Sequence, residues 1–288
     1  MPHRHHLLII DAQNDFCDLP PEWCPTDPVS GRRLAPALPV PGAHADLQRL
    51  ARFIAGSGAA LDAITATLDS HHRVDIAHPP FWRTDEGGPV APFTQITADD
   101  VMAGRYHPAD ETHAPRALAY LEALEARSRY TLMVWPVHCQ MGSWGQCLHA
   151  EVLAACSAWE ERQGRPVQVL HKGDNPWTEH YSALQAEVPD EHDPATGLNH
   201  ALLARLDRAA QLFIAGQASS HCVRATVEHL VAHLPAHRPE RLVLLSDGMS
   251  PVPGFEAQAA EFMAEMRARG VRSMSLAQAQ AALLSPAA

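Results

Sequence analysis

The chain has 288 residues, of which 46% are hydrophobic and 19% charged, with a formal net charge of −11 and an isoelectric point near 5.9. This length suffices for one large α/β domain, or one domain with a long insertion, and the acidic balance argues against a nucleic-acid partner and against an anionic lipid surface. The longest apolar runs are far shorter than a membrane span, and six cysteines without regular pairing indicate a reducing compartment, so we expect a cytoplasmic protein.

The first part of the chain predicts two buried strands joined by a helix. Residues 7–10 form a continuous apolar run, which is typical of a central parallel strand covered on both faces. Residues 17–43 are rich in proline and glycine and predict a long ordered loop. An amphipathic helix is expected over residues 45–55, followed by a second strand over residues 59–68.

The segment from about 83 to 128 has the weakest pattern, with turn-like residues and one weak helix near 115–127. Its apolar content is too low for a core of its own. We therefore expect it to be an insertion within a single domain that spans residues 1–288.

The rest of the chain alternates strands with helices, which predicts βαβ units and a mostly parallel sheet. A second irregular loop is expected over residues 174–197. The expected strands are 130–134, 167–170, 211–215, 241–246 and 270–274, and the expected helices are 147–162, 199–208, 223–234, 256–269 and 276–284.

Polar residues follow four of these strands, where open parallel sheets bind ligands. They are Asp11, Asp69 with His71, Lys172 and Cys222. Cys222 lies in a turn of small residues at the start of a helix, where free N–H groups and the helix dipole favour a nucleophilic thiolate. The alternative is an inert buried cysteine.

The other strand-end residues could serve such a thiol. Asp11 can take its proton, and Lys172 can hold the charges in place, although a loop-capping aspartate and a solvated lysine are the alternatives. Asp69 and His71 have the mixed oxygen and nitrogen chemistry of a first-row metal site, which His138 or His78 could complete. By spacing alone, a hydrated loop with incidental histidines is the favoured interpretation.

Five motifs together resemble the isochorismatase-like cysteine hydrolases, and within them the nicotinamidase branch. They occur in that family's order over roughly residues 6–275. In the family the cysteine often follows an acidic or aromatic pair, where this chain has Ser220-His221. The motifs are Leu-Ile-Ile-Asp11-x-Gln13-Asn14-Asp15-Phe16, Asp69-Ser-His71, Trp135-Pro-x-His138-Cys139, His171-Lys172-Gly173 and Gly216-x-Ala218-x-x-x-Cys222-Val223-x-x-Thr226.

The resemblance implies a three-layer, Rossmann-like α/β/α fold with a six-stranded, mostly parallel sheet. It implies a catalytic triad of Asp11, Lys172 and Cys222, and an oxyanion hole made by the N–H groups of Ala218 and Cys222 after a cis peptide bond. Phe16 and Trp135 match positions that enclose a substrate ring. One divalent ion is implied, zinc with iron or manganese as alternatives, on Asp69, His71 and His138, with His78 as a possible fourth ligand.

The expected activity is therefore metal-dependent hydrolysis of nicotinamide to nicotinate and ammonia through a thioester. The alternatives are the same chemistry on another small amide, and a catalytically silent binding protein on this fold. The expected partners are a small-molecule amide and further copies of the same chain in a homo-oligomer, with no nucleic acid and no membrane.

Overall fold

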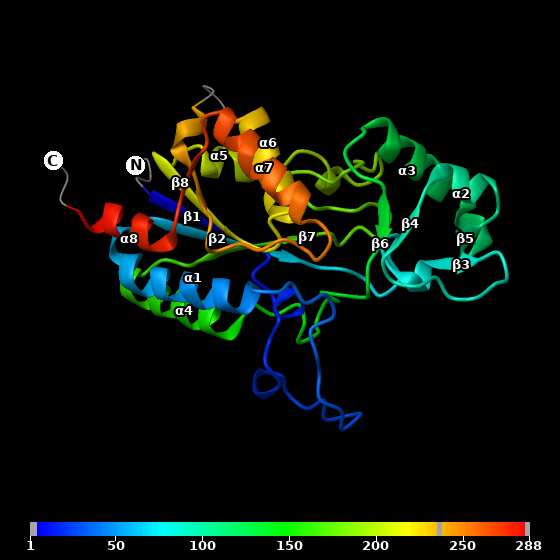
Figure 1. The fold of residues 1–288 in the computed structure, drawn as a ribbon, viewed down its shortest axis with the longest axis horizontal. Helices are drawn as coiled ribbons and strands as arrows, with labels where there is room; N and C mark the ends of the chain where they lie inside the picture. The colour runs from blue at the N-terminus through cyan, green and yellow to red at the C-terminus, as the bar shows by residue number, and fades with distance from the viewer. Residues whose placement is uncertain (1–4, 235–237, 286–288) are drawn as a thin grey trace.

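A six-stranded parallel sheet lies at the centre of the computed structural model, which describes residues 5–234 and 238–285 (Figure 1). The strands run in the order β7–β2–β1–β8–β9–β10 across the sheet, so the predicted fold class is confirmed. Their bounds are β1 His5–Ile10, β2 Ala63–Asp69, β7 Gln168–Lys172, β8 Gln211–Gly216, β9 Leu242–Leu245 and β10 Arg272–Met274.

The two middle strands, β1 and β8, are buried beyond their first residues, because helices cover both of their faces. Their register pairs Leu7 with Phe213 and Ile10 with Gly216. After β1, the next strands of the sheet, β2 and β7, are added toward one edge. After β8, strands β9 and β10 are added toward the other edge. Strand order therefore reverses between β1 and β8, and in open α/β sheets ligands bind in the crevice beyond the carboxyl ends at such a point.

Helices form the two outer layers (Figure 1). One face carries α1 (Ala43–Ser57), α4 (Ala150–Gln163) and α8 (Leu276–Leu284), and the other carries α5 (His200–Leu206), α6 (Cys222–His233) and α7 (Glu256–Ala268). The apolar stripe predicted for α1 is buried against the sheet and α4 through Leu47, Leu50 and Ile54. Within the described part of the chain, none of the helices has the length and apolar character required to cross a bilayer.

The segment predicted to be irregular folds into a small lobe beyond the carboxyl ends of the sheet (Figure 1). It contains two antiparallel strand pairs, β3 with β5 and β4 with β6, and two helices. The strand predicted over 130–134 thus pairs with β4 outside the central sheet. Strands of three residues are too short to show an alternating pattern, so the sequence could not reveal this pairing. The bounds are β3 Trp82–Thr84, β4 Thr94–Ile96, α2 Ala98–Met102, β5 Tyr106–Pro108, α3 Ala114–Ala126 and β6 Leu132–Val134.

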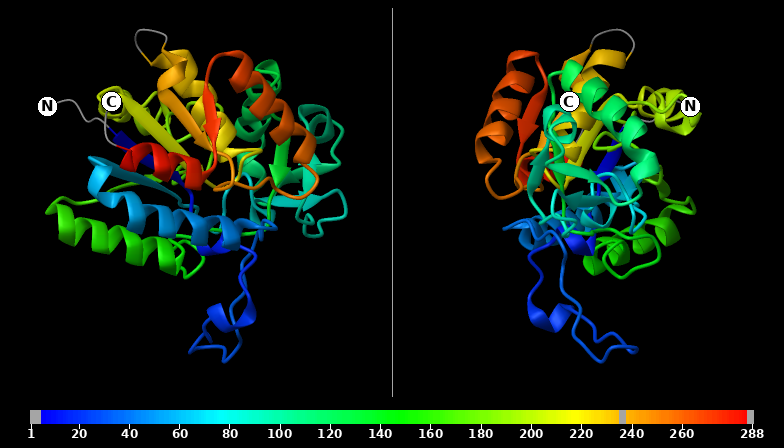
Figure 2. Two further views of the ribbon diagram at one scale, coloured as in Figure 1. Left: turned by 60° about the vertical axis from the view of Figure 1, so that its left-hand side comes forward. Right: turned by 90° about the vertical axis from the view of Figure 1, so that its right-hand side faces the viewer.

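The loop predicted over 17–43 extends away from the body as an arm, which we define as residues 18–37 (Figures 1 and 2). A bridge between Thr26 and Arg33 gives the arm a hairpin form, and the side chain of Val29 at its tip is 94% exposed. A second bridge, between Cys17 and Val40, closes the base of the arm against the body. The arm therefore leaves and rejoins the fold beside the end of β1.

Candidate active site

The three residues of the predicted triad lie together at the point where strand order reverses. Asp11 follows β1, Lys172 ends β7 and Cys222 begins α6 after β8. The Lys172 Nζ lies 2.9 Å from the Asp11 Oδ2 and 3.6 Å from the Cys222 Sγ. All three side chains are buried. The topology thus joins residues that are far apart in the sequence.

Lys172 occupies the centre of this cluster. Its Nζ also lies 2.9 Å from the Asp69 Oδ1 and donates to the backbone oxygen of His180 at 2.9 Å. Burial would lower the pKa of Lys172, but the carboxylates of Asp11 and Asp69 outweigh it and hold that pKa well above its usual value. The ammonium therefore stays charged and links the triad to Asp69.

Asp11 is held on its other side by Thr67. The Thr67 hydroxyl donates to the Asp11 Oδ1 at 2.6 Å and accepts from the Asp11 backbone N–H at 3.0 Å. Asp11 has a φ of +43°, a left-handed conformation that aspartate tolerates better than most residues. Burial raises the pKa of Asp11, and the Lys172 charge offsets part of that effect. A carboxyl with a raised pKa is well suited to proton transfer.

Cys222 differs from the sequence expectation in its ionisation. Burial raises the pKa of the thiol well above its ordinary value, although the neighbouring Lys172 lowers it. Burial thus favours the protonated thiol over the thiolate that a helix start would favour. Nucleophilic chemistry at Cys222 therefore requires a base, and the acidic oxygens of Asp11 and Asp69 lie within 4.8 Å of the sulfur.

The turn from Gly216 to Cys222 brings backbone close to the sulfur. Gly216 has a φ of +125°, and a Cβ at this position would lie 1.8 Å from the Ile10 carbonyl oxygen, so only glycine fits. The peptide bond between Gln217 and Ala218 is cis, as the resemblance implied. Among the described residues, nothing accepts a hydrogen bond from the N–H groups of Ala218 and Cys222. These two donors are available to an oxyanion.

The predicted metal ligands also converge, and all four side chains are buried. The Asp69 Oδ2 lies 3.1 Å from the His71 Nε2 and 3.5 Å from the His138 Nε2. Nitrogens of His71, His78 and His138 lie within 4.8 Å of one another. The His71 Nε2 is buried, and among the described residues its contact with the Asp69 Oδ2 lacks hydrogen-bond geometry. Three imidazoles and one carboxylate that converge in this way fit a divalent first-row metal ion.

The opposite nitrogens of these histidines are anchored. The His71 Nδ1 lies 3.1 Å from the Asp75 Oδ2, and the His78 Nδ1 lies 3.1 Å from the backbone oxygen of His72. Such second contacts fix the ring orientation and tautomer of a metal-binding histidine. Burial and the neighbouring histidines lower the pKa of His78 to about 2, so its ring is neutral, as a ligand requires.

A small cavity lies between these ligands and the thiol. Phe16 and Trp135 line it and give it aromatic walls. The Cys222 sulfur and the candidate metal ligands Asp69 and His138 thus border one cavity. The full lining is Phe16, Leu38, Asp69, Trp135, His138, Glu179, Tyr181, Ala218, His221, Cys222 and Val252.

Three polar residues of this cavity were missed by the sequence reasoning. Glu179 and Tyr181 come from the irregular loop over 174–197, which carries no periodic signal. The Tyr181 hydroxyl accepts from the Trp135 Nε1 at 3.0 Å, whereas the Glu179 Oε2 is buried without a partner among the described residues. His221 directly precedes Cys222, and that position was the available clue to its place in the cavity.

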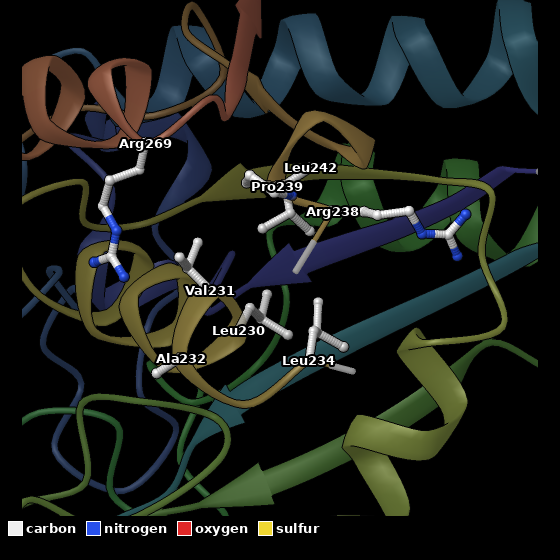
Figure 3. Close-up of a pocket in the computed structure, with 8 residues that line it drawn as sticks. All are labelled: Leu230, Val231, Ala232, Leu234, Arg238, Pro239, Leu242 and Arg269. Carbon is white, nitrogen blue, oxygen red and sulfur yellow. The ribbon is translucent and has the colours of Figure 1, made fainter. Parts of the chain in front are cut away.

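A larger hollow, of about 550 Å³, lies elsewhere in the described chain (Figure 3). Leu230 and Leu234 of the α6 end, Leu242 at the start of β9, Arg238 and Arg269 are among its lining residues. It therefore lies toward the amino ends of the strands, opposite the crevice. It contains none of the clustered acidic, thiol or imidazole groups, so the smaller cavity is the candidate active site.

Comparisons with known proteins support the fold. No family model matches the chain, and no curated protein matches its sequence. Among solved structures, yeast nicotinamidase bound to the inhibitor nicotinaldehyde is 16% identical, with a TM-score of 0.61 and coverage of 94% of this chain and 99% of that one. Pyrazinamidase of Pyrococcus horikoshii in complex with zinc is 18% identical, with a TM-score of 0.52 and coverage of 94% and 99%.

An isochorismatase-like hydrolase from Alkaliphilus metalliredigens is also similar, at 13% identity, with a TM-score of 0.51 and coverage of 97% of this chain and 98% of that one. Each similarity spans nearly the full length of both chains. The chain therefore has the fold of the isochorismatase-like hydrolases, as the motifs indicated.

Proposed function

We propose that this chain, which has the isochorismatase-like hydrolase fold, is a metal-dependent cysteine amidohydrolase that converts nicotinamide to nicotinate and ammonia. The observation that supports this most strongly is the position of Lys172. Its Nζ contacts Asp11, the Cys222 sulfur and the metal-ligand candidate Asp69 at once. A nucleophile, a base and a metal site thus meet at one aromatic-walled cavity.

The chemistry follows from the protonated resting thiol. Asp11 takes the proton of Cys222, and the sulfur attacks the amide carbon while the N–H groups of Ala218 and Cys222 hold the developing oxyanion. Asp11 then gives this proton to the amide nitrogen, and ammonia leaves as the thioester forms. Water, deprotonated by Asp11, attacks the thioester carbon, so that nicotinate leaves and the sulfur regains a proton. Lys172 remains charged throughout and holds the Asp11 carboxylate and the Cys222 thiolate close to each other.

The metal site serves orientation in this proposal. Asp69, His71 and His138, with His78 as a fourth ligand, would hold a divalent ion, zinc or alternatively iron or manganese, which supplies a position for the ring nitrogen directly or through water. Phe16 and Trp135 enclose the ring. The oxyanion donors lie in the turn before α6, so the ring nitrogen and the carbonyl are held at opposite ends of the cavity.

Ammonia release from nicotinamide, pyrazinamide, benzamide and a panel of other small amides tests this function, together with metal analysis of the purified protein. We expect turnover of nicotinamide and pyrazinamide, loss of turnover on chelation, and partial recovery with zinc, manganese or iron. Benzamide should be a much poorer substrate because it lacks the ring nitrogen. Cys222→Ala should fold and bind metal without turnover. Comparable kcat/KM values for benzamide and nicotinamide would contradict this use of the metal.

A second candidate is the same chemistry on a different small amide. The Glu179 Oε2, which has no hydrogen-bond partner among the described residues, favours it, because an amide with a donor beyond its carboxamide could pair with this oxygen. The highest kcat/KM in the panel would then belong to an amide with an additional hydrogen-bond donor. A silent binding protein is disfavoured, because Asp11, Lys172 and Cys222 are all present.

A further inference from the structure

His221 forms part of the cavity wall beside the nucleophile. Its ring packs edge-on against Trp135 at 5.1 Å and Phe255 at 4.6 Å, and lies 5.2 Å from the Tyr181 ring, between centroids. The side chain is 6% exposed. Aromatic neighbours therefore hold the imidazole in one orientation, immediately next to Cys222.

One ring nitrogen has a fixed partner. The His221 Nδ1 lies 2.9 Å from the Ser220 Oγ, and that oxygen also accepts from the Val252 N–H at 3.1 Å. Ser220 is 2% exposed, so leaving its hydroxyl proton without an acceptor would cost roughly 1–3 kcal/mol. Among the described residues, the His221 Nδ1 is the one acceptor paired with that hydroxyl. The hydroxyl therefore donates to Nδ1, which must be the unprotonated nitrogen.

The other nitrogen is then a donor. In a neutral imidazole whose Nδ1 is unprotonated, the proton is on Nε2. Burial and the Arg224 charge lower the pKa of His221 to about 3, so the ring is neutral near pH 7. No described residue accepts a hydrogen bond from Nε2, although the residue lines the cavity.

We propose that His221 is a positioning residue that presents its Nε2–H to the substrate and favours heteroaromatic amides with an acceptor next to the carboxamide. This rests on the proposed function. His221 and Cys222 both line this cavity, and His221 also borders a second hollow with Tyr130 and Arg224. In our proposal the Nε2–H donor faces the first cavity, at the end where the carboxamide meets the sulfur. Pyrazinamide has a ring nitrogen beside its carboxamide, whereas nicotinamide has a C–H at both such positions. Pyrazinamide therefore has one hydrogen-bond acceptor beside its carboxamide that nicotinamide lacks.

The activity test compares kcat/KM for pyrazinamide with that for nicotinamide. His221→Phe keeps a ring but removes the donor, so we expect the pyrazinamide-to-nicotinamide ratio to fall about three- to tenfold. His221→Gln places an amide N–H near the Nε2 position and should restore most of the ratio. His221→Asn reaches only the Nδ1 position and should not. An unchanged ratio in His221→Phe, or equal rescue by Asn and Gln, would overturn the proposal.

A matched control is available in His149, a second buried histidine that stacks on Trp23 and does not line the cavity. His149→Gln should leave the ratio unchanged.

A spectroscopic test needs no turnover. Nitrogen-15 shifts of labelled protein, with the His221 signals identified by their loss in His221→Gln, should report a neutral ring protonated on Nε2 from pH 5 to pH 8. Ser220→Ala should shift this signal toward a mixture of tautomers. If the wild type hydrolyses neither amide, the proposed function fails. The inference on His221 is then decided by these shifts, and an Nδ1–H tautomer or an imidazolium at pH 7 would refute it.

Discussion

The proposed proton transfer depends on the pairing of two buried acids. The thiol of Cys222 and the carboxyl of Asp11 both have raised pKa values because burial disfavours their charged forms, and Lys172 opposes that effect at each. Neither group is activated by itself. The ammonium of Lys172 lowers the cost of whichever of the two carries the negative charge, so the proton can move between them without leaving the cavity.

Replacing Asp11 with asparagine should keep the size and contacts of the side chain but remove its ability to take a proton. Asparagine can still accept from the Thr67 hydroxyl but cannot take a proton, so kcat should fall about 10²–10⁴-fold with the fold intact. Steady-state kinetics and circular dichroism would check this. Asp18 provides a control, because its carboxylate accepts only from the Gly42 and His44 N–H groups in the described chain, and Asp18→Asn should turn over normally. Near wild-type rates for Asp11→Asn would remove its role as the base.

A second change at this scale concerns the orientation of His71. Asp75 accepts a hydrogen bond from the nitrogen of His71 that faces away from the metal ligands, so Asp75→Asn should weaken metal binding about 10–100-fold. Competition with a chromophoric chelator measures this directly, and excess metal should restore activity. The control is Asp85→Asn on the exposed surface of the lobe. Unchanged metal affinity would mean that Asp75 does not support the site.

The backbone at the end of β8 lies very close to the backbone at the end of β1. Gly216 makes this possible, since no other residue can adopt its backbone conformation without striking the Ile10 carbonyl. The turn that carries Ala218 and Cys222 begins at this residue. The position of the oxyanion donors therefore depends on the contact between two strands.

Gly216→Ala should consequently lose both stability and activity. Backbone strain alone should cost about 1–3 kcal/mol, and the collision with Ile10 adds to it. Denaturant unfolding measures the loss. Gly31→Ala in the arm is the comparison, because its φ is also positive at +68° but no atom lies within 4 Å of the added Cβ. Equal losses at the two positions would show that the strand contact contributes nothing.

The loop over 174–197 is joined to α6 through buried charges. Arg129 lies 3.4 Å from the Glu187 carboxylate and 2.6 Å from that of Glu228 on α6. Burial raises the pKa of Glu187 to about 7 from 4.5, and Arg129 offsets part of the effect. The folded protein thus binds this proton more tightly than the unfolded chain. The resulting stability is complete below about pH 4.5 and is lost as the pH rises through about 7.

Glu187→Gln should remove that dependence. Between pH 5 and pH 8 the free energy of unfolding of the wild type should decline relative to the variant, by about 3 kcal/mol at most. Urea unfolding at a series of pH values provides the comparison, with Glu261→Gln on the surface of α7 as the control. Parallel pH profiles for the wild type and Glu187→Gln would contradict the assignment of this proton.

At the scale of the whole molecule, the tip of the arm, residues 26–33, is separate from the packing that maintains the site. Replacing residues 26–33 with Asn-Gly should shorten the hairpin, because the Leu34 N–H already donates to the Pro25 oxygen at 2.9 Å. We expect a nearly unchanged melting temperature and kcat, measured by calorimetry and ammonia release. A large loss of stability would show that the tip packs on something outside this chain. Sedimentation of both forms would test the predicted homo-oligomer.

The middle of the sheet was predictable because β1, β8 and β9 are buried on both faces and leave unbroken apolar runs, as at Leu7–Ile10. The residues at strand ends were predictable because parallel strands end at one edge. The lobe was not, since its strands are too short for a pattern. Glu179 and Tyr181 come from a loop without periodicity, and the protonation of Cys222 depends on burial that no local pattern reveals. Cellular location stays a prediction.

The pairing of β1 with β8 also has a consequence for synthesis on the ribosome. His5 of β1 pairs with Gln211 of β8, so one edge of β1 stays unpaired until a segment about 200 residues later has been synthesised. At about 5–20 residues per second, that interval lasts roughly 10–40 seconds. During it the nascent chain exposes an apolar strand edge, which is a template for pairing with other chains. Recovery of this protein from a cell should therefore depend on chaperones that bind nascent chains, and slower translation should increase that dependence.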